Sequence, residues 1–146
     1  MDVSPSQPAA GVPELIDQLA DPDRLQRVHA AVALVRVGRR DPRLVGALTA
    51  ALKDGRPVVR KMAALVLGDL APDVREAVPA LADALRDPDE GVRRRVVVAL
   101  GQFGPDGAAA VPALRAALHD KDEGVRSFAA TSLELIEPQQ GQSRAA

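Results

Sequence analysis

The side chains that most often carry chemistry in proteins are scarce or scattered in this sequence. The chain has no Cys, which excludes a thiolate nucleophile, a disulfide framework and a Cys-ligated metal. Its two histidines, His29 and His119, are far apart in the sequence. A metal site needs several ligands that converge at helical or short-loop spacing, and neither histidine has such neighbours. We therefore predict no metal site.

Carboxylates are plentiful, but they gather in short turns, in the run Asp87 to Glu90 and again in Asp120 to Glu123. A calcium loop is longer and ends in a bidentate Glu, so the spacing of these turns does not fit one. Ser127 has no neighbouring His or Lys to act as its base. Because no catalytic group of residues is found, we expect a protein that is not an enzyme and that needs no cofactor.

A basic cluster is formed by Arg93-Arg94-Arg95, with Arg56, Arg60 and Lys61 one repeat earlier. Its residue types suit phosphate contacts, so weak phosphate or nucleic-acid binding is one alternative function. The formal net charge of -1 gives no overall attraction to nucleic acid, and the chain has no Trp or Tyr to stack on bases. We therefore do not expect nucleic acid to be the main partner.

The elements that carry these residues recur every 33 residues, in four copies without insertion or deletion. Such a period indicates repeats stacked in one dimension, with the apolar columns as the core. Three columns consist entirely of leucine: Leu15, Leu48, Leu81 and Leu114 in the first, Leu19, Leu52, Leu85 and Leu118 in the second, and Leu34, Leu67, Leu100 and Leu133 in the third.

Each copy is predicted to be a pair of antiparallel helices. In the copy from Val78 to Gly104, apolar residues recur at helical spacing on both sides of an acidic turn. The proline of that turn, Pro88, cannot continue the first helix. We predict an all-α chain of about eight helices, with repeats at 12–40, 44–71, 74–104 and 107–137, a flexible lead-in at 1–11 and a flexible tail at 138–146.

Polar residues replace apolar ones in the first and last copies. Gln18 and Gln26 stand where later copies have Ala or Val, and Thr131, Ser132 and Glu134 replace aliphatic, Ala or Gly residues. The two open faces of a stack need such polar substitutions. We therefore expect these copies to cap the stack and the chain to be complete.

The motif V-P-A-L-x-x-A-L-x-D-P-D-E-G-V-R-R, from Val78 to Arg94, resembles the HEAT repeat, and most of all the short bacterial variety found in phycobilisome-lyase-type proteins. The resemblance covers roughly residues 12–137. It implies a right-handed α-solenoid whose second helices line a concave, protein-binding surface. It also implies a structural ladder between repeats, formed by Asp21, Asp54, Asp87 and Asp120 with Arg27, Arg60, Arg93 and Arg126.

The second helices carry an apolar stripe with a charged edge, which is typical of a surface that binds a partner. The opposing interpretation is that these side chains pack between repeats, and the next column (His29, Met62, Arg95 and Phe128) is a competing candidate for the exposed edge. The stripe consists of Leu25, Val28, Val32, Val58, Leu65 and Val98, and its charged edge of Arg36, Lys61, Asp69 and Arg94. The residues expected to bind a partner are Val28, Val32, Lys61, Leu65, Arg94 and Val98.

These observations favour a non-enzymatic scaffold or adaptor that binds a segment of another protein. A chromophore lyase or isomerase subunit is the alternative implied by the resemblance. We expect a monomer or weak homodimer. We also expect it to be located in the cytoplasm, because the N-terminus does not have the pattern of a secretory signal and the longest aliphatic run, Val96 to Leu100, is too short to span a bilayer.

Overall fold

The computed structural model describes residues 10–38 and 40–138. Within these residues the chain forms eight α-helices, two short 3-10 helices and no strand, which confirms the predicted all-α class. The expected lead-in and tail lie almost entirely outside the described residues. The helices are α1 (Val12–Gln18), α2 (Arg24–Gly38), α3 (Arg43–Ala51), α4 (Pro57–Asp69), η1 (Arg75–Ala77), α5 (Val78–Ala84), α6 (Glu90–Gln102), η2 (Gly104–Ala110), α7 (Val111–Ala117) and α8 (Glu123–Ile136).

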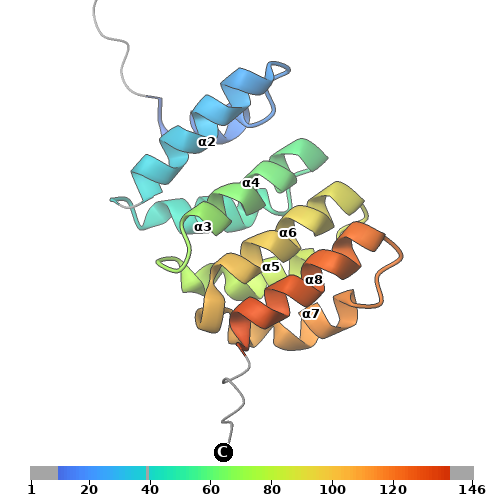
Figure 1. Cartoon of the computed structure of the whole chain (residues 1–146). Helices are drawn as coiled ribbons and strands as arrows, with labels where there is room; N and C mark the ends of the chain where they lie inside the picture. Colours follow the sequence, from blue (N-terminus) through green and yellow to red (C-terminus); the bar gives the residue numbers. More distant parts are fainter. Residues whose placement is uncertain (1–9, 39, 139–146) are drawn as a thin grey trace, which may run out of the picture.

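The helices form two layers, and each consecutive pair contributes one helix to each layer (Figure 1). The first helices, α1, α3, α5 and α7, form one layer, and the longer second helices form the other. In the second layer α4 packs closely on α6, and α6 packs closely on α8, whereas α2 makes a much less extensive contact with α4. The stack is therefore tight in its last three repeats and looser at its first junction.

The turns between paired helices explain where the second helices begin. The side chain of Asp89 accepts a hydrogen bond from the backbone N–H of Val92 at 2.9 Å, and Asp122 accepts one from Val125 at 2.9 Å. Each aspartate thus caps the first turn of α6 or α8, whose N–H groups have no partner within the helix. In α4 the first helical residue is Pro57, which lacks the N–H that would need a partner.

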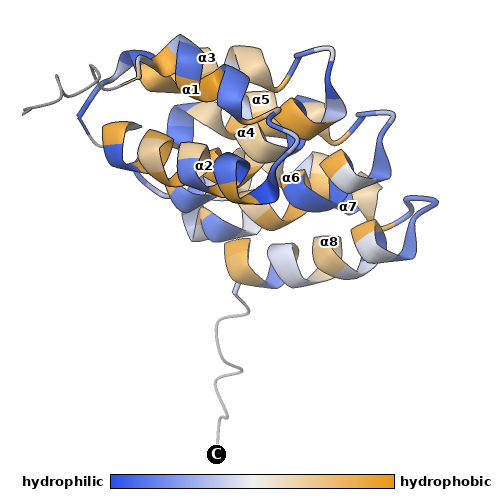
Figure 2. Cartoon of the chain, turned by 90° about the horizontal axis from the view of Figure 1, so that it is seen from above, coloured by the Kyte–Doolittle hydropathy of each residue, from blue (hydrophilic) through white to orange (hydrophobic). Residues whose placement is uncertain are grey.

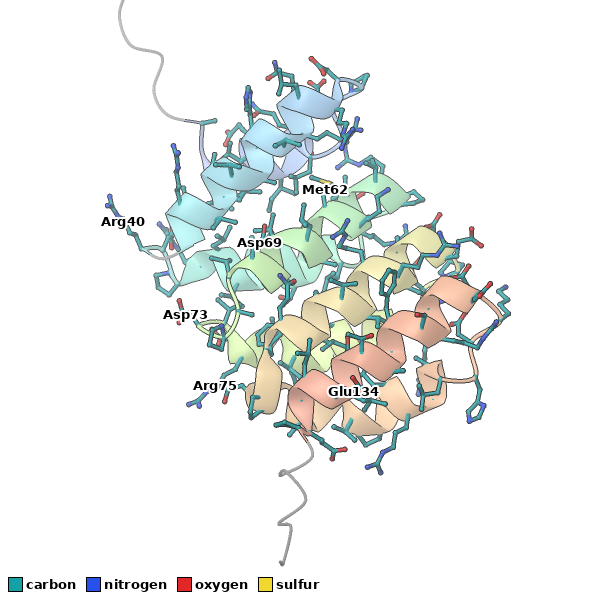
Figure 3. All side chains as sticks on the ribbon, viewed as in Figure 1. Arg40, Met62, Asp69, Asp73, Arg75 and Glu134 are labelled. Carbon is teal, nitrogen blue, oxygen red and sulfur yellow. The ribbon has the colours of Figure 1, made fainter. Side chains whose placement is uncertain are left out.

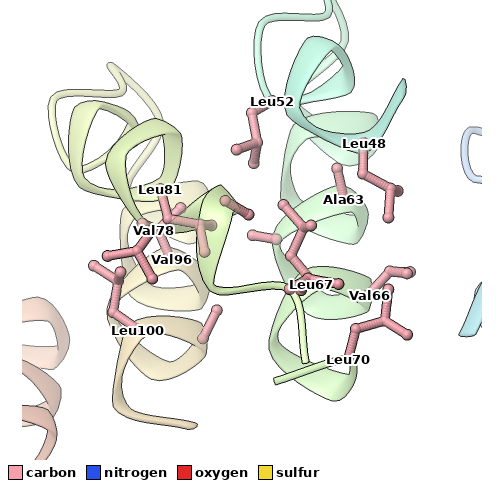
Figure 4. Packing of buried hydrophobic residues seen from close by; sticks show 14 of the residues in the cluster. Leu48, Leu52, Ala63, Val66, Leu67, Leu70, Val78, Leu81, Val96 and Leu100 are labelled. Atoms are coloured by element: carbon pink, nitrogen blue, oxygen red, sulfur yellow. The ribbon is translucent and has the colours of Figure 1, made fainter. Parts of the chain in front are cut away.

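The core lies between the two layers and consists largely of Leu, Val and Ala (Figure 4). The column with Leu34, Leu67 and Leu100 is fully buried in the first three repeats. The column with Leu19 and Leu52 is buried in the first two repeats but only half-buried in the last two, at Leu85 and Leu118, which differs from the expectation. All four leucines follow the last residue of a first helix, so the difference in burial lies between repeats and not in the position along the helix.

Glycines allow the close approach of the second helices. A Cβ atom at Gly68 would lie 3.0 Å from Ala99 Cα in α6, and one at Gly101 would lie 3.2 Å from Ser132 Cα in α8. In the first repeat the same column holds Val35. The junction of α2 with α4, where valine stands in place of glycine, is also the one with the less extensive contact.

Most, but not all, of the polar residues that were expected on the open faces of the first and last repeats are exposed. Gln18, Gln26, Thr131 and Glu134 are exposed, as expected. Ser132 is not part of an open face, because it is buried against α6 and its hydroxyl donates a hydrogen bond to the Val97 carbonyl at 2.8 Å. It is a small residue that packs against Gly101, and its polarity is satisfied inside the stack.

Candidate partner-binding face

The turn aspartates and helix arginines form the ladder between the last three repeats. Arg60 donates from Nε and Nη2 to the carboxylate of Asp87 at 2.7 and 3.0 Å. Arg93 binds Asp120 in the same way, at 2.9 and 3.1 Å. The third nitrogen of each guanidinium donates to a backbone carbonyl of its own turn, that of Asp54 or Asp87. Each arginine therefore joins two turns, and these charges are not available to a partner.

The first step of the ladder is different. Arg27 donates to the backbone carbonyls of Asp21 and Pro22, at 2.7 and 3.1 Å, but to no carboxylate in the described part of the chain. Asp54, its expected partner, instead accepts hydrogen bonds from Arg56, which lower the pKa of the Asp54 carboxyl. The junction between the first two repeats thus lacks the ladder ion pair, and an exposed pair between Arg56 and Asp17, at 3.2 Å, joins them instead.

The outermost ladder residues of the described part of the chain, Asp21 and Arg126, bind within their own turns. The carboxylate of Asp21 accepts a hydrogen bond from the backbone N–H of Asp23 at 2.8 Å. Arg126 donates to the backbone carbonyl of Asp120 at 2.8 Å. Both side chains therefore hold their own turn, as the equivalent residues of the middle repeats do.

Arg94 of the predicted charged edge also has an internal partner. Its guanidinium makes two hydrogen bonds to Asp122, one of them at 2.7 Å, and lies 3.6 Å from Glu90. A Cβ atom at Gly124 would lie 2.8 Å from Arg94 Nε, so the glycine leaves the room that the arginine occupies. Arg94 holds the pKa of Asp122 far below its ordinary value, assisted by the N–H of Val125.

The exposed part of the predicted stripe lies on α2. Leu25 is 57% exposed, Val28 43% and Val32 45%. Their spacing of three and four residues places them in a row on one side of the helix. We call these three residues the α2 stripe. Together they form an apolar surface on a helix whose opposite side, at Ala30, Ala31 and Leu34, is already buried in the core.

Along the stack the stripe becomes less accessible. Leu65 on α4 and Val98 on α6 occupy the same column as Val32, but both are half-buried because neighbouring helices pack close to them. Val58 is half-buried as well. The stripe is therefore an exposed surface in the first repeat, whereas in the middle repeats its side chains are partly packed between repeats. Each of the two opposing interpretations applies to a different part of the stack.

The competing column does not form a continuous edge. His29 and Phe128 are exposed, Arg95 is intermediate, and Met62 is 9% exposed. Figure 3 shows Met62 between α4 and α2, where its flexible side chain fills the looser junction. The column is thus interrupted by a core residue.

Cations with no carboxylate partner among the described residues lie at the two ends of the α2 stripe. Arg24 and Arg36 are exposed at its two ends. Lys61 is exposed on α4, one repeat along from Val28, but its side chain extends toward α6, where its Cδ would lie 3.9 Å from a Cβ atom at Gly91. Asp69, at the end of α4, is an exposed carboxylate on the same side of the molecule (Figure 3). Sequence reasoning missed Arg24, although its position one residue before Leu25 is a usable signal.

Sequence reasoning also missed two residues that shape the face. Asp122 neutralises Arg94, but the sequence alone presents it only as one of several turn carboxylates. On α2, Val35 stands where α4 and α6 have Gly68 and Gly101, and this difference was visible in the sequence column.

Neither histidine lies in a group of potential ligands. His29 is exposed on α2, and His119 is exposed in the turn after α7. Across residues 10–38 and 40–138, no three His, Asp or Glu side chains come together as a metal site would require. In the same part of the chain, no helix has the length and the apolar composition needed to cross a bilayer.

Known structures share this architecture. A chain from the complex of CpcE and CpcF of phycocyanin lyase from Nostoc sp. PCC7120 is similar over 91% of this chain and 82% of its own, with a TM-score of 0.75 and 20% identity. Human deoxyhypusine hydroxylase in complex with glycerol has a TM-score of 0.65 and 29% identity, over 91% of this chain and 51% of its own. An engineered protein has a TM-score of 0.54 and 24% identity, over 86% of this chain and 62% of its own.

The match to the human enzyme is partial, because this chain spans about half of its length. No curated protein matches the sequence. The family model that describes HEAT repeats matches residues 12–88 and again residues 78–146. The paired helices and the ladder of the last three repeats have the form that the resemblance implied. The chain belongs to the HEAT-repeat family.

Proposed function

We propose that this protein is a non-enzymatic scaffold or adaptor that binds a segment of another protein on the face formed by α2, α4, α6 and α8. The observation that carries the proposal is the α2 stripe. Three large aliphatic side chains in a row are exposed on a helix whose opposite side is already in the core. A helix that is apolar on both sides is expected to have a second apolar partner. The contact residues we propose are Val28, Val32, Lys61, Leu65, Arg94 and Val98.

The fold supports this proposal in a general way, since repeat solenoids offer extended binding surfaces. One structural relative was solved as part of a complex of two proteins, CpcE and CpcF. Its identity of 20% supports the fold alone, so a lyase activity is not proposed for this chain. Phosphate binding through Arg93–Arg95 is disfavoured, because Arg93 and Arg94 already pair with carboxylates. As part of the proposal, we place the protein in the cytoplasm of a bacterium, as a monomer or weak homodimer.

Site-specific photo-crosslinking in the native cell tests the proposal. A photoreactive residue placed at Val32 is expected to capture a distinct partner protein. The matched control carries the same residue at Ala50, which is exposed on α3 in the opposite layer. The proposal would be contradicted if no partner protein is crosslinked at position 32, or if the same protein is crosslinked equally well at position 50.

A further inference from the structure

We propose that the first repeat, formed by α1 and α2, opens from the stack as a unit of its own, whereas the last three repeats unfold together. In a stack of repeats, stability is the sum of each repeat's own stability and of the contacts that it makes with its neighbours. A repeat at the end of the stack that makes weak contacts with its one neighbour therefore opens at a lower free energy than the remainder. The two ends of the described stack differ in these contacts.

Charged pairs between neighbouring turns hold the last repeat. Arg93 on α6 binds the carboxylate of Asp120 through two hydrogen bonds, at 2.9 and 3.1 Å, and both side chains are largely buried. Arg94 binds Asp122 in the same turn. A bidentate pair fixes the position of one element on another, and breaking a buried one leaves a charge without its counter-charge. The last repeat is therefore costly to separate from the third.

The first repeat has no pair of this kind among the described residues. Arg27, its ladder arginine, donates only to backbone carbonyls of its own turn. The ion pair that does cross this junction joins Arg56 to Asp17, whose side chains are 47% and 75% exposed. Water screens such a pair, and holding two long side chains in one geometry costs entropy, so the pair contributes little to stability. The first repeat is thus without the charged connection that holds the last.

The second helices also meet differently at the two ends. At the last junction Gly101 of α6 lies against Ser132 of α8, and the Ser132 hydroxyl donates a hydrogen bond to the Val97 carbonyl at 2.8 Å. At the first junction the contact of α2 with α4 is less extensive, and α2 carries Val35 in the column of Gly101. The last repeat therefore has a close helix contact with an internal hydrogen bond, in addition to its ion pairs.

Apolar contacts hold the first repeat in place. Leu19 and Leu34 are fully buried, and α1 packs on α3. The C-terminal end of α2 is close to the second repeat, since a Cβ atom at Gly38 would lie 2.6 Å from Leu44 Cδ2 and 2.9 Å from Leu70 Cδ1. This tight contact lies where the chain passes into the second repeat. The first repeat is therefore folded on the stack, but by contacts without the ion pairs of the other junctions.

The opening affects the face that is proposed to bind a partner. Val32 on α2 and Leu65 on α4 lie on opposite sides of the first junction. Figure 2, which views the stack from the α2 end, shows hydrophobic and hydrophilic residues together on the outward side of α2. A partner segment that contacts both Val32 and Leu65 holds the first repeat closed. This consequence rests on the proposed function, whereas the opening itself does not.

Hydrogen exchange of the backbone amides, followed by NMR on the full chain, tests the opening. Protection factors are compared between the middle of α2 and the middle of α8, because each helix lies at one end of the described stack. The protection factors of the α2 amides are expected to be lower than those of the α8 amides by about tenfold or more. Equal protection of the two helices would show that both ends open alike, and it would overturn the proposal.

Two variants in one repeat column show whether the units are separate. Leu100→Ala truncates a fully buried side chain of α6 and is expected to lower the protection of the α4, α6 and α8 amides by about tenfold or more. The α2 amides are expected to keep their parent values, because the first repeat opens while the others are still folded. Leu34→Ala, the matched variant on α2, is expected to lower the protection of the α2 amides.

Two results with these variants contradict the proposal. If Leu100→Ala lowers the protection of α2 and α6 by the same factor, the four repeats unfold as one unit. If Leu34→Ala leaves the α2 amides unchanged, these amides do not exchange through an opening of their repeat. Val96→Ala, a smaller truncation of a fully buried side chain on α6, replaces Leu100→Ala if that variant does not fold.

The outcomes separate this inference from the proposed function, because hydrogen exchange is measured on the free protein. If photo-crosslinking at Val32 captures a partner but the four repeats exchange as one unit, the scaffold stands and the opening is wrong. If the α2 amides show a separate opening but no partner is captured, the opening stands and the proposed function fails.

Discussion

The guanidinium of Arg93 binds the carboxylate of Asp120 in the following repeat through two hydrogen bonds, while its remaining nitrogen holds the carbonyl of Asp87 at 2.9 Å. The arginine is only 5% exposed. A buried, bidentate pair of this kind fixes the position of one turn relative to the next. Arg27, the equivalent residue of the first repeat, makes only the carbonyl contacts.

Arg93→Ala is therefore expected to lower the free energy of unfolding by about 3–5 kcal/mol, because it leaves the Asp120 carboxylate without its counter-charge. Arg27→Ala is the matched control and is expected to cost about 1 kcal/mol, the value of its hydrogen bonds to carbonyls. Urea denaturation of both variants at pH 7 measures the difference. Equal losses would show that the inter-repeat ion pair contributes nothing.

Glycine-to-alanine changes at two helical positions are expected to have opposite effects. Gly46→Ala, on the exposed side of α3, is expected to stabilise the protein by about 0.5–1 kcal/mol, because no atom within 4 Å obstructs the new methyl group. Gly68→Ala is expected to destabilise it by up to about 2 kcal/mol, because the methyl group meets the α6 backbone at Ala99. Thermal unfolding compares the two, and a stabilised Gly68→Ala variant would contradict the close approach of α4 and α6.

Two leucines of the repeat are expected to respond differently to truncation. Leu100→Ala is expected to cost about 2–5 kcal/mol, because Leu100 is fully buried and its loss leaves a cavity. Leu85 is half-buried, so Leu85→Ala is expected to cost less, about 1–2 kcal/mol. Chemical denaturation measures both. A loss for Leu85→Ala as large as that for Leu100→Ala would contradict the observed burial.

The Arg94–Asp122 pair predicts a dependence of stability on acid. Arg94 lowers the pKa of Asp122 in the folded state below its unfolded value of about 3.9. The folded state then binds fewer protons, so the stabilisation is present above about pH 4 and is lost as the pH falls from there towards the lowered folded pKa. Asp122→Asn is expected to lose less stability than the parent protein when the pH is lowered from about 5 to about 3, because this interval includes the unfolded pKa of about 3.9.

Asp106→Asn in η2 is the matched control for that experiment, because the Asp106 side chain makes no hydrogen bond in the described structure. The midpoint of urea denaturation is measured for both variants and the parent at each pH. If Asp122→Asn and the parent lose stability in parallel as the pH falls, the ion pair is not the source of the acid sensitivity.

The sequence by itself determined the repeat, the helix pairs and the columns that meet. An unbroken period of 33 residues places like residues at like positions, so the burial of Leu34, Leu67 and Leu100 was accessible from spacing. The pairing of Arg93 with Asp120 was expected from the resemblance to HEAT repeats. These properties depend on contacts that every interior repeat makes in the same way.

The tertiary structure alone decided which members of a column are available to a partner. Val32, Leu65 and Val98 are alike in sequence, yet only Val32 is strongly exposed, because its exposure depends on how closely the next helix approaches. The contact of α2 with α4 is less extensive than that of α4 with α6, and in the column that holds Gly68 and Gly101, α2 carries Val35. In the same way Arg94 is neutralised by Asp122 because Gly124 leaves space between them. A column of the repeat shows which residue type stands at a position. How exposed that residue is, and which charge it pairs with, depend on the residues that pack around it in the folded protein.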